Sequence, residues 1–204
     1  MTANQHWRDL AVAGHEGNES LARAGLADAD PMARQLALGA LDRIGALTGA
    51  DLRHAFGDPD AMVRHRAALL AAHHREVSLL DLLDDPDETV VEAAAWAAGE
   101  QETTDDVIVS TLIRLAASPD DPMVREAAIA ALGAIGDERG LPAILAGCAD
   151  KPAIRRRAVL ALAPFAGPEV DAALAGALVD RDWQVRQAAE DLLPHMGTQP
   201  TEET

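Results

Sequence analysis

Residues 121–136 read Asp-Pro-Met-Val-Arg-Glu-Ala-Ala-Ile-Ala-Ala-Leu-Gly-Ala-Ile-Gly. Asp121 is a favourable helix N-cap, and Pro122 suits the first helical position, where a missing N–H costs little. Apolar side chains then recur at i, i+4, i+7, i+8 and i+11, namely Val124, Ala128, Ala131, Leu132 and Ile135. This spacing predicts an amphipathic helix with one buried face, and Gly136 ends it.

The same phrase returns along nearly the whole chain. Its central pair of residues appears as Ala33-Arg34, Val63-Arg64, Val90-Val91, Val124-Arg125, Ile154-Arg155 and Val185-Arg186. The steps between the second residues of these pairs are 30, 27, 34, 30 and 31 residues. A period of this size predicts a stack of repeated supersecondary units, each of which buries its apolar face against its neighbours.

Each unit contains two helices, because a shorter helical stretch follows the Val-Arg helix. Residues 137–148 form the clearest example, with Pro142 near the start. The template predicts six pairs. The first helices are expected near 18–27, 48–56, 76–83, 104–117, 138–148 and 168–178, and the second helices near 31–44, 60–73, 87–99, 122–135, 152–164 and 182–194. We expect one domain over residues 1–195, with residues 1–15 as an N-terminal cap, and a disordered polar tail over 196–204.

The charge of the chain limits its partners. It carries 34 acidic against 17 basic residues, a formal net charge of −17. Such a polyanion has no sequence-independent attraction to nucleic acid or to anionic lipid, so neither is an expected partner. Basic proteins or peptides are better candidates.

Cysteine usage and hydropathy indicate an intracellular setting. Cys148 is the single cysteine, which excludes a disulfide framework and a cysteine-based metal knuckle. The first twenty residues lack the apolar core of a signal peptide, and no run approaches 18 uncharged apolar residues. We therefore expect a cytoplasmic protein, a monomer without a cofactor.

The phrase Asp-x-Pro-x-Val-Arg-x-x-Ala-x-x-Ala-Leu-Gly-x-Ile-Gly resembles the HEAT-like repeat, in the variety named after phycobilisome lyases. The resemblance covers residues 17–195, and its weakest copy has Val91 where Arg is usual. It implies an all-α fold, a right-handed α-solenoid of about six antiparallel helix pairs with the Val-Arg helices on the concave side. The family includes scaffolds, bilin lyases and isomerases, and iron-dependent deoxyhypusine hydroxylases, so the resemblance is specific for fold and weak for function.

The repeated arginines are candidates for a structural ladder. They are Arg34, Arg64, Arg125, Arg155 and Arg186. Aspartates stand four or five residues before the repeated position, which is Val91 in one copy, at Asp30, Asp60, Asp87, Asp121, Asp150 and Asp182. Bidentate guanidinium pairing favours contacts with Asp carboxylates or carbonyl groups at the turns of adjacent repeats. The alternative is a row of anion-binding arginines.

Other chemistry-bearing residues have plain structural interpretations. The pair His15-Glu16 and the adjacent His73 and His74 suggest a metal site, but adjacent helical residues point about 100° apart and cannot both face one ion. Cys148 lies in an Ala/Leu helix, where a buried, inert thiol is expected.

A basic cluster is formed by Lys151, Arg156 and Arg157, beside the ladder position of Arg155. The simplest interpretation is a solvent-exposed surface whose positive charge offsets the negative charge of Asp150. The alternative is a grip on a phosphate or an acidic peptide near the helix N-terminus, where the helix dipole favours an anion.

Residues 81–106 contain ten carboxylates and no Lys or Arg. Within this stretch Glu92, Trp96 and Glu100 follow at i, i+4 and i+8 and so share one helix face. A Trp flanked by two carboxylates can anchor a peptide that bears Arg or Lys. Glu126 is a further candidate on the next Val-Arg helix. The alternative, which the residue pattern alone favours, is that Trp96 fills the core.

We therefore predict a non-enzymatic scaffold for protein–protein interaction that uses the Val-Arg helices to recruit a basic segment. The alternative is an accessory to enzyme chemistry, lyase-like or oxidoreductase-like, which rests on the family resemblance. Nucleic-acid binding through a helical-repeat groove is a third possibility, against which the charge argues.

Overall fold

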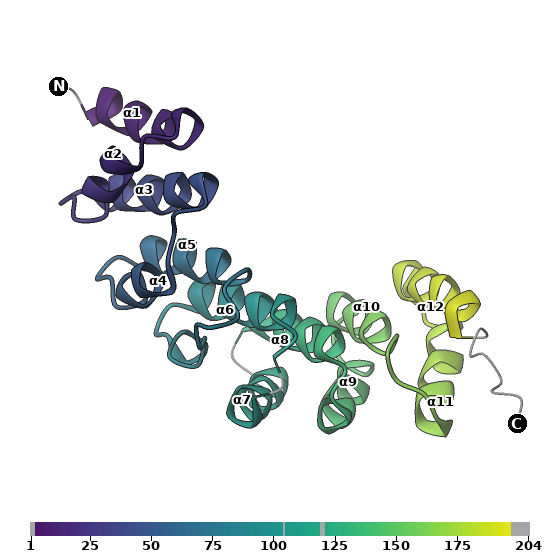
Figure 1. Ribbon diagram of the computed structural model, residues 1–204. Helices are drawn as coiled ribbons and strands as arrows, with labels where there is room; N and C mark the ends of the chain where they lie inside the picture. Colours follow the sequence, from purple (N-terminus) through teal and green to yellow (C-terminus); the bar gives the residue numbers. More distant parts are fainter. Residues whose placement is uncertain (1–2, 104, 119–120, 197–204) are drawn as a thin grey trace, which may run out of the picture. The chain divides into compact units, whose positions relative to one another are not determined.

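The computed structural model describes residues 3–103, 105–118 and 121–196 (Figure 1). Over these residues the chain is all-helical, as predicted, with twelve α-helices, two short 3-10 helices and no strand. The chain divides into two compact units, residues 1–97 and 98–204, and the boundary falls within α6. None of the described helices is long and apolar enough to cross a membrane.

The first unit contains six α-helices, the last of which runs into the second unit. They are α1 (Ala3–Glu16), α2 (Glu19–Gly25), α3 (Pro31–Ile44), α4 (Gly49–Phe56), α5 (Ala61–Ala71) and α6 (Glu88–Glu100). The helix α3 packs against α1 on one side and α5 on the other, while α2 and α4 pack behind α3 and α5. Buried Ala and Leu side chains such as Ala37, Leu38 and Leu41 form the core, and their small size allows the close packing of successive helices.

The second unit repeats this arrangement. Its helices are α7 (Asp106–Ala116), α8 (Pro122–Ile135), α9 (Leu141–Gly147), α10 (Pro152–Ala161), α11 (Pro168–Ala177) and α12 (Trp183–Met196). The helices α8, α10 and α12 pack in succession, and α7, α9 and α11 pack against them. We call α3, α5, α6, α8, α10 and α12, which carry the repeated phrase, the second helices.

Local chemistry explains where the second helices begin and end. The side chain of Asp121 accepts a hydrogen bond from the N–H of Met123, and Pro122 occupies the first turn of α8. Gly136 then takes the left-handed conformation, with φ of 70°, and its N–H bonds to the carbonyl of Leu132. The same pattern of Asp, Pro and Gly opens and closes α3.

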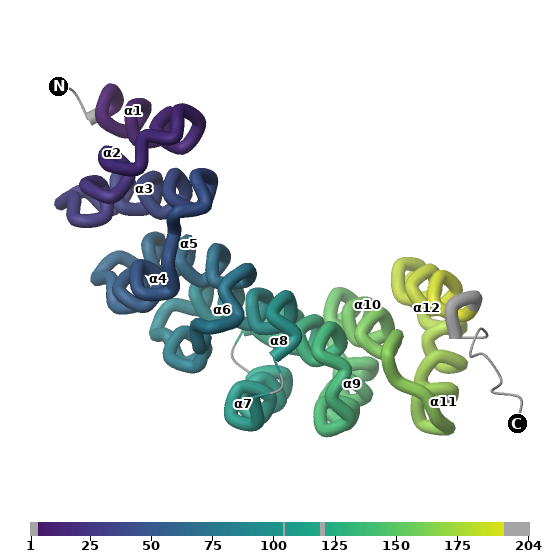
Figure 2. The backbone as a smooth tube through the Cα atoms, viewed as in Figure 1, coloured from purple at the N-terminus to yellow at the C-terminus, as the bar shows by residue number. Residues whose placement is uncertain are grey.

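One predicted helix is wrong: residues 76–83 form turns followed by a short 3-10 helix, η1 (Leu82–Asp84). Figure 2 follows the backbone through this connection between α5 and α6. The step of 27 residues is the shortest in the chain, so less chain is available here for a first helix. Pro86 holds Asp85 in an extended conformation, and the Ser78 hydroxyl accepts a bond of 3.3 Å from the N–H of Leu80, which favours a turn. The apolar side chains remain buried, at Val77, Leu79, Leu82 and Leu83.

The N-terminal residues predicted to be a cap form the helix α1, which packs against α2 and α3. Its Trp7 indole donates a hydrogen bond of 2.6 Å to Asp30, and Leu10 packs in a cluster with Ala33 and Ala37. The sequence predicts a polar tail over residues 196–204, but Met196 is the last residue of α12, and residues 197–204 lie outside the described residues.

Candidate binding surface

Four of the five repeated arginines bond to an aspartate. Arg34 pairs with Asp58 at 2.6 Å, Arg64 with Asp85 at 2.7 Å, Arg125 with Asp150 at 3.1 Å, and Arg155 with Asp180 at 2.8 Å. Each guanidinium also donates to a backbone carbonyl at its own turn, as Arg155 does to Asp150 at 2.9 Å. Arg186 keeps the carbonyl bond, to Asp180 at 2.7 Å, and has no ion pair within the described residues.

Helix capping and pairing with the ladder arginine are carried out by different aspartates in most turns, whereas the sequence pattern pointed to one aspartate for both roles. Asp182, like Asp30, Asp60, Asp87 and Asp121, caps its helix by accepting from the N–H two residues ahead. In three pairs the ladder partner is a different residue, which stands two positions before the capping aspartate in the turn of the following repeat, at Asp58, Asp85 and Asp180. The fourth partner, Asp150, precedes a helix that has no capping aspartate. Asp180 accepts from Arg155 and also from the N–H of Asp182 at 2.8 Å. Of the aspartates proposed from sequence, only Asp150 is a ladder partner.

These bonds change the acidity of the carboxyl groups. The hydrogen bond from Arg155, followed by that from the N–H of Asp182, lowers the pKa of Asp180 against the opposing effect of burial. At Asp58, burial is the largest effect and raises the pKa, but the hydrogen bonds from Arg34 and the N–H of Asp60 outweigh it, so the pKa is lowered overall. With their pKa values lowered, Asp58 and Asp180 are ionised across the neutral pH range.

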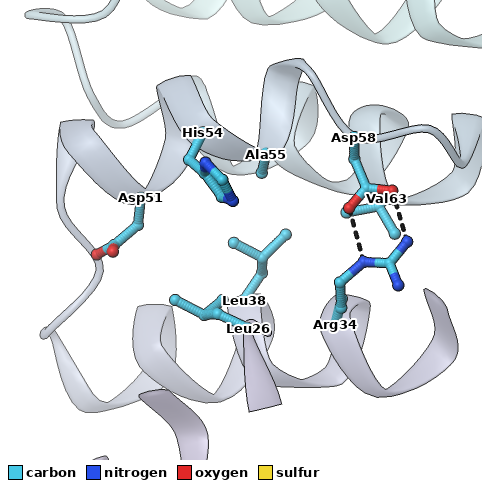
Figure 3. Close-up of a pocket in the computed structure, with 8 residues that line it drawn as sticks. All are labelled: Leu26, Arg34, Leu38, Asp51, His54, Ala55, Asp58 and Val63. Carbon is cyan, nitrogen blue, oxygen red and sulfur yellow. Dashed lines mark hydrogen bonds and ion pairs between the residues drawn. The ribbon is translucent and has the colours of Figure 1, made fainter. Parts of the chain in front are cut away.

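The Arg34–Asp58 pair closes a small cavity between the first two helix pairs (Figure 3). The cavity holds about 80 Å³, with the apolar side chains of Leu26 and Leu38 facing Ala55 across it. Ligand sites usually measure about 300 Å³ or more. This cavity is thus a gap in the packing behind a ladder pair, and it supports a structural role for the repeated arginines.

The predicted binding residues Glu92, Trp96 and Glu100 form a stripe on α6, which we call the α6 stripe. The side chains that flank it on the helix, from Ala93 to Ala95 and from Ala97 to Gly99, are all buried. Trp96 is 43% exposed. The expectation that Trp96 fills the core is therefore wrong, because the neighbouring alanines take the buried positions and the indole projects outward.

Neither carboxylate of the α6 stripe pairs with a described Lys, Arg or His. Glu126, the other predicted binding residue, does have a cationic partner. Glu126 lies on α8 and accepts a bond of 3.3 Å from Arg157. This ion pair already uses one cation of the predicted basic cluster, while Lys151 stays exposed. Glu126 is thus a partly neutralised carboxylate, unlike Glu92 and Glu100.

Two larger hollows lie on the second helices. One, of about 280 Å³, lies between α8 and α10 in the second unit and includes Leu160 and Arg157. The other, of about 330 Å³, lies among α1, α3 and α5 in the first unit and includes Arg43 and Arg66. We call the latter the unit 1 pocket. Sequence reasoning missed it, because its cations lie outside the repeated Arg position.

The residues considered for metal or thiol chemistry are dispersed. Among the described residues, no group of three or more His, Cys, Asp or Glu is arranged to hold a metal ion. His74 bonds to Glu76 at 3.1 Å in the turn after α5. Burial raises the pKa of the Cys148 thiol to about 11, which keeps it protonated and unreactive at neutral pH.

Comparison with known proteins supports the repeat architecture. A family model of HEAT repeats matches residues 76–153. No curated protein matches the chain. Together with the all-helical structure and its neighbours among solved structures, the match supports HEAT-like repeats in an armadillo-like helical fold, as the sequence resemblance predicted.

Three solved structures illustrate this similarity. YibA of Escherichia coli is 18% identical, with a TM-score of 0.68, over 97% of this chain and 85% of its own. A designed armadillo repeat protein in complex with the peptide (KR)4 is 18% identical, with a TM-score of 0.60, over 96% and 99%. Human deoxyhypusine hydroxylase, in complex with glycerol, is 19% identical, with a TM-score of 0.50, over 97% and 81%. At these identities the likeness concerns the fold, which is typical of protein-binding scaffolds.

Proposed function

We propose that this protein is a non-enzymatic, cytoplasmic scaffold that binds a basic segment of a partner protein through the α6 stripe. The observation that carries the proposal is the exposed indole of Trp96 between two carboxylates that have no described cationic partner. An indole face attracts Lys and Arg side chains, and the flanking carboxylates supply acceptors for the same groups.

The electrostatics of α6 favour a cationic ligand. The helix has no basic residue in its last turn, and Glu100 is its final residue. A carboxylate at the C-terminal end of a helix is repelled by the helix dipole, so this arrangement costs stability in the free protein. A bound Lys or Arg would relieve that repulsion, which makes the stripe a better cation site than an ordinary carboxylate pair.

The packing of α6 favours an anchoring role for Trp96. The helix is held by buried alanines on its other faces, so the exposed indole is carried on a rigid support. Rigid aromatic side chains that become desolvated on binding are the common energetic centres of protein interfaces. The designed armadillo protein of the same fold binds a peptide of alternating Lys and Arg, which supports the choice of a basic segment as the ligand.

The proposal can be tested with fluorescein-labelled (Lys-Arg)4 and the full chain by fluorescence anisotropy. The Glu92→Gln/Glu100→Gln variant should weaken binding by about tenfold, since two charge-assisted contacts are lost. Binding by a chain of net charge −17 can also be unspecific, so a control must remove two charges elsewhere. Glu169→Gln/Glu190→Gln serves this purpose, because both residues are exposed and lie on α11 and α12. Equal weakening in both variants would contradict the proposal.

A further inference from the structure

The unit 1 pocket combines cations with apolar walls in a strongly acidic chain. His15 from α1, Arg43 from α3 and Arg66 from α5 border it, together with Met32 and Leu36, and no carboxylate is among its lining residues. The chain has twice as many acidic as basic residues, 34 against 17, so a hollow with only basic charge stands out. Its complement is an anion.

The two guanidinium groups of the pocket differ from the ladder arginines in their bonding. Within the described residues neither Arg43 nor Arg66 has an ion pair, whereas Arg34 and Arg64 on the same helices are paired with aspartates. A guanidinium is charged at every physiological pH and presents several donors in a planar fork. Two such groups beside one hollow can therefore bind a carboxylate in a bidentate manner.

A glycine positions one of these cations. A Cβ atom at Gly39 would lie 2.7 Å from Nη2 of Arg66, and the three atoms nearest to it would all belong to Arg66. The absence of a side chain at Gly39 thus lets the Arg66 guanidinium lie directly over α3. Gly39 in α3 and Trp96 in α6 occupy the same position of their repeats. The unit 1 pocket therefore has no side chain at the position where the α6 stripe has its indole.

We infer that the unit 1 pocket binds an acidic side chain of a peptide segment, with the carboxylate between Arg43 and Arg66 and the neighbouring apolar residue against Met32 and Leu36. The hollow of about 330 Å³ suits a single side chain with its neighbour. A phosphate backbone instead needs an extended run of cations, which a chain of net charge −17 opposes. This inference is independent of the α6 stripe, which has the opposite charge.

The inference can be tested by fluorescence anisotropy with a fluorescein-labelled peptide of four alternating Glu-Leu pairs and the full chain. Arg43→Gln/Arg66→Gln should weaken binding by about tenfold or more. The matched control, Arg8→Gln/Arg53→Gln, removes two exposed arginines of the same unit and should change the affinity less than about twofold. No binding by the unaltered chain, or equal loss in both variants, would overturn the inference.

A second variant tests the geometry without changing the charge. Gly39→Ala places a methyl group where the Arg66 guanidinium lies, and it also favours the helical state of α3. It should therefore weaken binding of the Glu-Leu peptide while the thermal transition is retained. Unchanged affinity in Gly39→Ala would contradict the placement of the carboxylate at Arg66.

Two competitors identify the source of the anion. An unlabelled Glu-Leu peptide should displace the probe far better than glutarate at the same carboxylate concentration, because glutarate lacks the apolar neighbour. Equal displacement by glutarate would mean a small-anion site and overturn the peptide assignment. Tighter binding of an oligothymidylate, lost in the Arg43→Gln/Arg66→Gln variant, would overturn it in favour of nucleic acid.

Discussion

Arg155 donates two hydrogen bonds of 2.8 Å to the carboxylate of Asp180, which lies in the turn before the next second helix. Arg34 and Arg64 donate two bonds each to Asp58 and Asp85 in the same way, whereas Arg125 donates one bond of 3.1 Å to Asp150. Each pair ties a second helix to the turn that starts its successor. The repeated arginine is therefore a connector between neighbouring repeats within a unit.

Removal of a ladder arginine should destabilise the protein more when the arginine has more bonding partners. Arg155→Ala removes the guanidinium donors of Asp180, which keeps only the N–H of Asp182, and of the Asp150 carbonyl in a partly buried setting. We expect a loss of about 1–3 kcal/mol in the free energy of unfolding. Arg186→Ala, which removes a guanidinium that has only the carbonyl bond among the described residues, should cost less. Urea unfolding followed by circular dichroism measures both.

Arg139→Ala is the surface control for this series. Arg139 pairs with Asp137 and Asp106 but is exposed, and solvent screens such pairs. We expect its unfolding midpoint to match that of the unaltered protein. A loss in Arg139→Ala as large as that in Arg155→Ala would remove the distinction between ladder and surface arginines.

The ladder should also shape the response to acid. The pKa of Asp180 is lowered in the folded state by Arg155, so below about pH 5 the unfolded chain takes up the proton more readily than the folded one. The stabilisation is complete above the unfolded pKa and is lost as the pH falls through the lower folded pKa. Asp180→Asn should therefore be less stable at about pH 7, and the difference should shrink towards about pH 3.

Urea unfolding at a series of pH values checks this prediction. Asp171→Asn, which alters an exposed residue of α11 outside the ladder, is the matched control and should track the unaltered protein throughout. If the stability difference caused by Asp180→Asn is the same at all pH values, the carboxylate does not act through its charge.

Close helix packing in the second unit predicts opposite effects for two glycine substitutions. A Cβ at Gly133 in α8 would lie 2.6 Å from Cα of Ala161 in α10, so Gly133→Ala forces the helices apart and should cost about 1–3 kcal/mol. A Cβ at Gly176 in α11 would meet nothing within 4 Å, so Gly176→Ala should add about 0.5–1 kcal/mol through helix propensity. Thermal melts of the two variants should shift in opposite directions, and a shared direction would contradict the packing.

Cys148 should react slowly with thiol reagents. Because burial raises its pKa to about 11, the thiolate is about one part in a thousand at about pH 8. We expect Ellman's reagent to modify the folded protein roughly a hundredfold more slowly than the protein in denaturant. Equal rates in the two states would show that the thiol is accessible and ionised, and would reopen a nucleophilic role.

Much of this fold follows from the sequence because the second helices carry the repeated apolar spacing, and five of the six begin with a capping Asp. The turns at residues 73–81 could not be predicted from the apolar pattern. The leucines of this connection are buried in turns to the same degree as a helix would bury them. The ladder partner was misassigned because Asp180 and Asp182 are two residues apart, and only the three-dimensional structure separates the cap from the ion pair.

The candidate surfaces were predictable to different degrees. The α6 stripe could be found from i, i+4 spacing, but the exposure of Trp96 depends on which residues its alanine neighbours contact. The unit 1 pocket depends on Arg43 and Arg66, which are 23 residues apart and lie at different positions of their repeats. The one signal in the sequence is Gly39, where a missing side chain leaves room for Arg66.

The most direct measurement of the central claim uses Trp96 as its own reporter. In a Trp7→Phe/Trp183→Phe variant that keeps a cooperative thermal transition, Trp96 is the remaining tryptophan. Titration with unlabelled (Lys-Arg)4 should change its emission in a saturable way, with the Kd found by anisotropy, and Glu92→Gln/Glu100→Gln should raise that Kd by about tenfold. Binding seen by anisotropy with unchanged Trp96 emission, and with the same Kd in the double variant, would contradict the account.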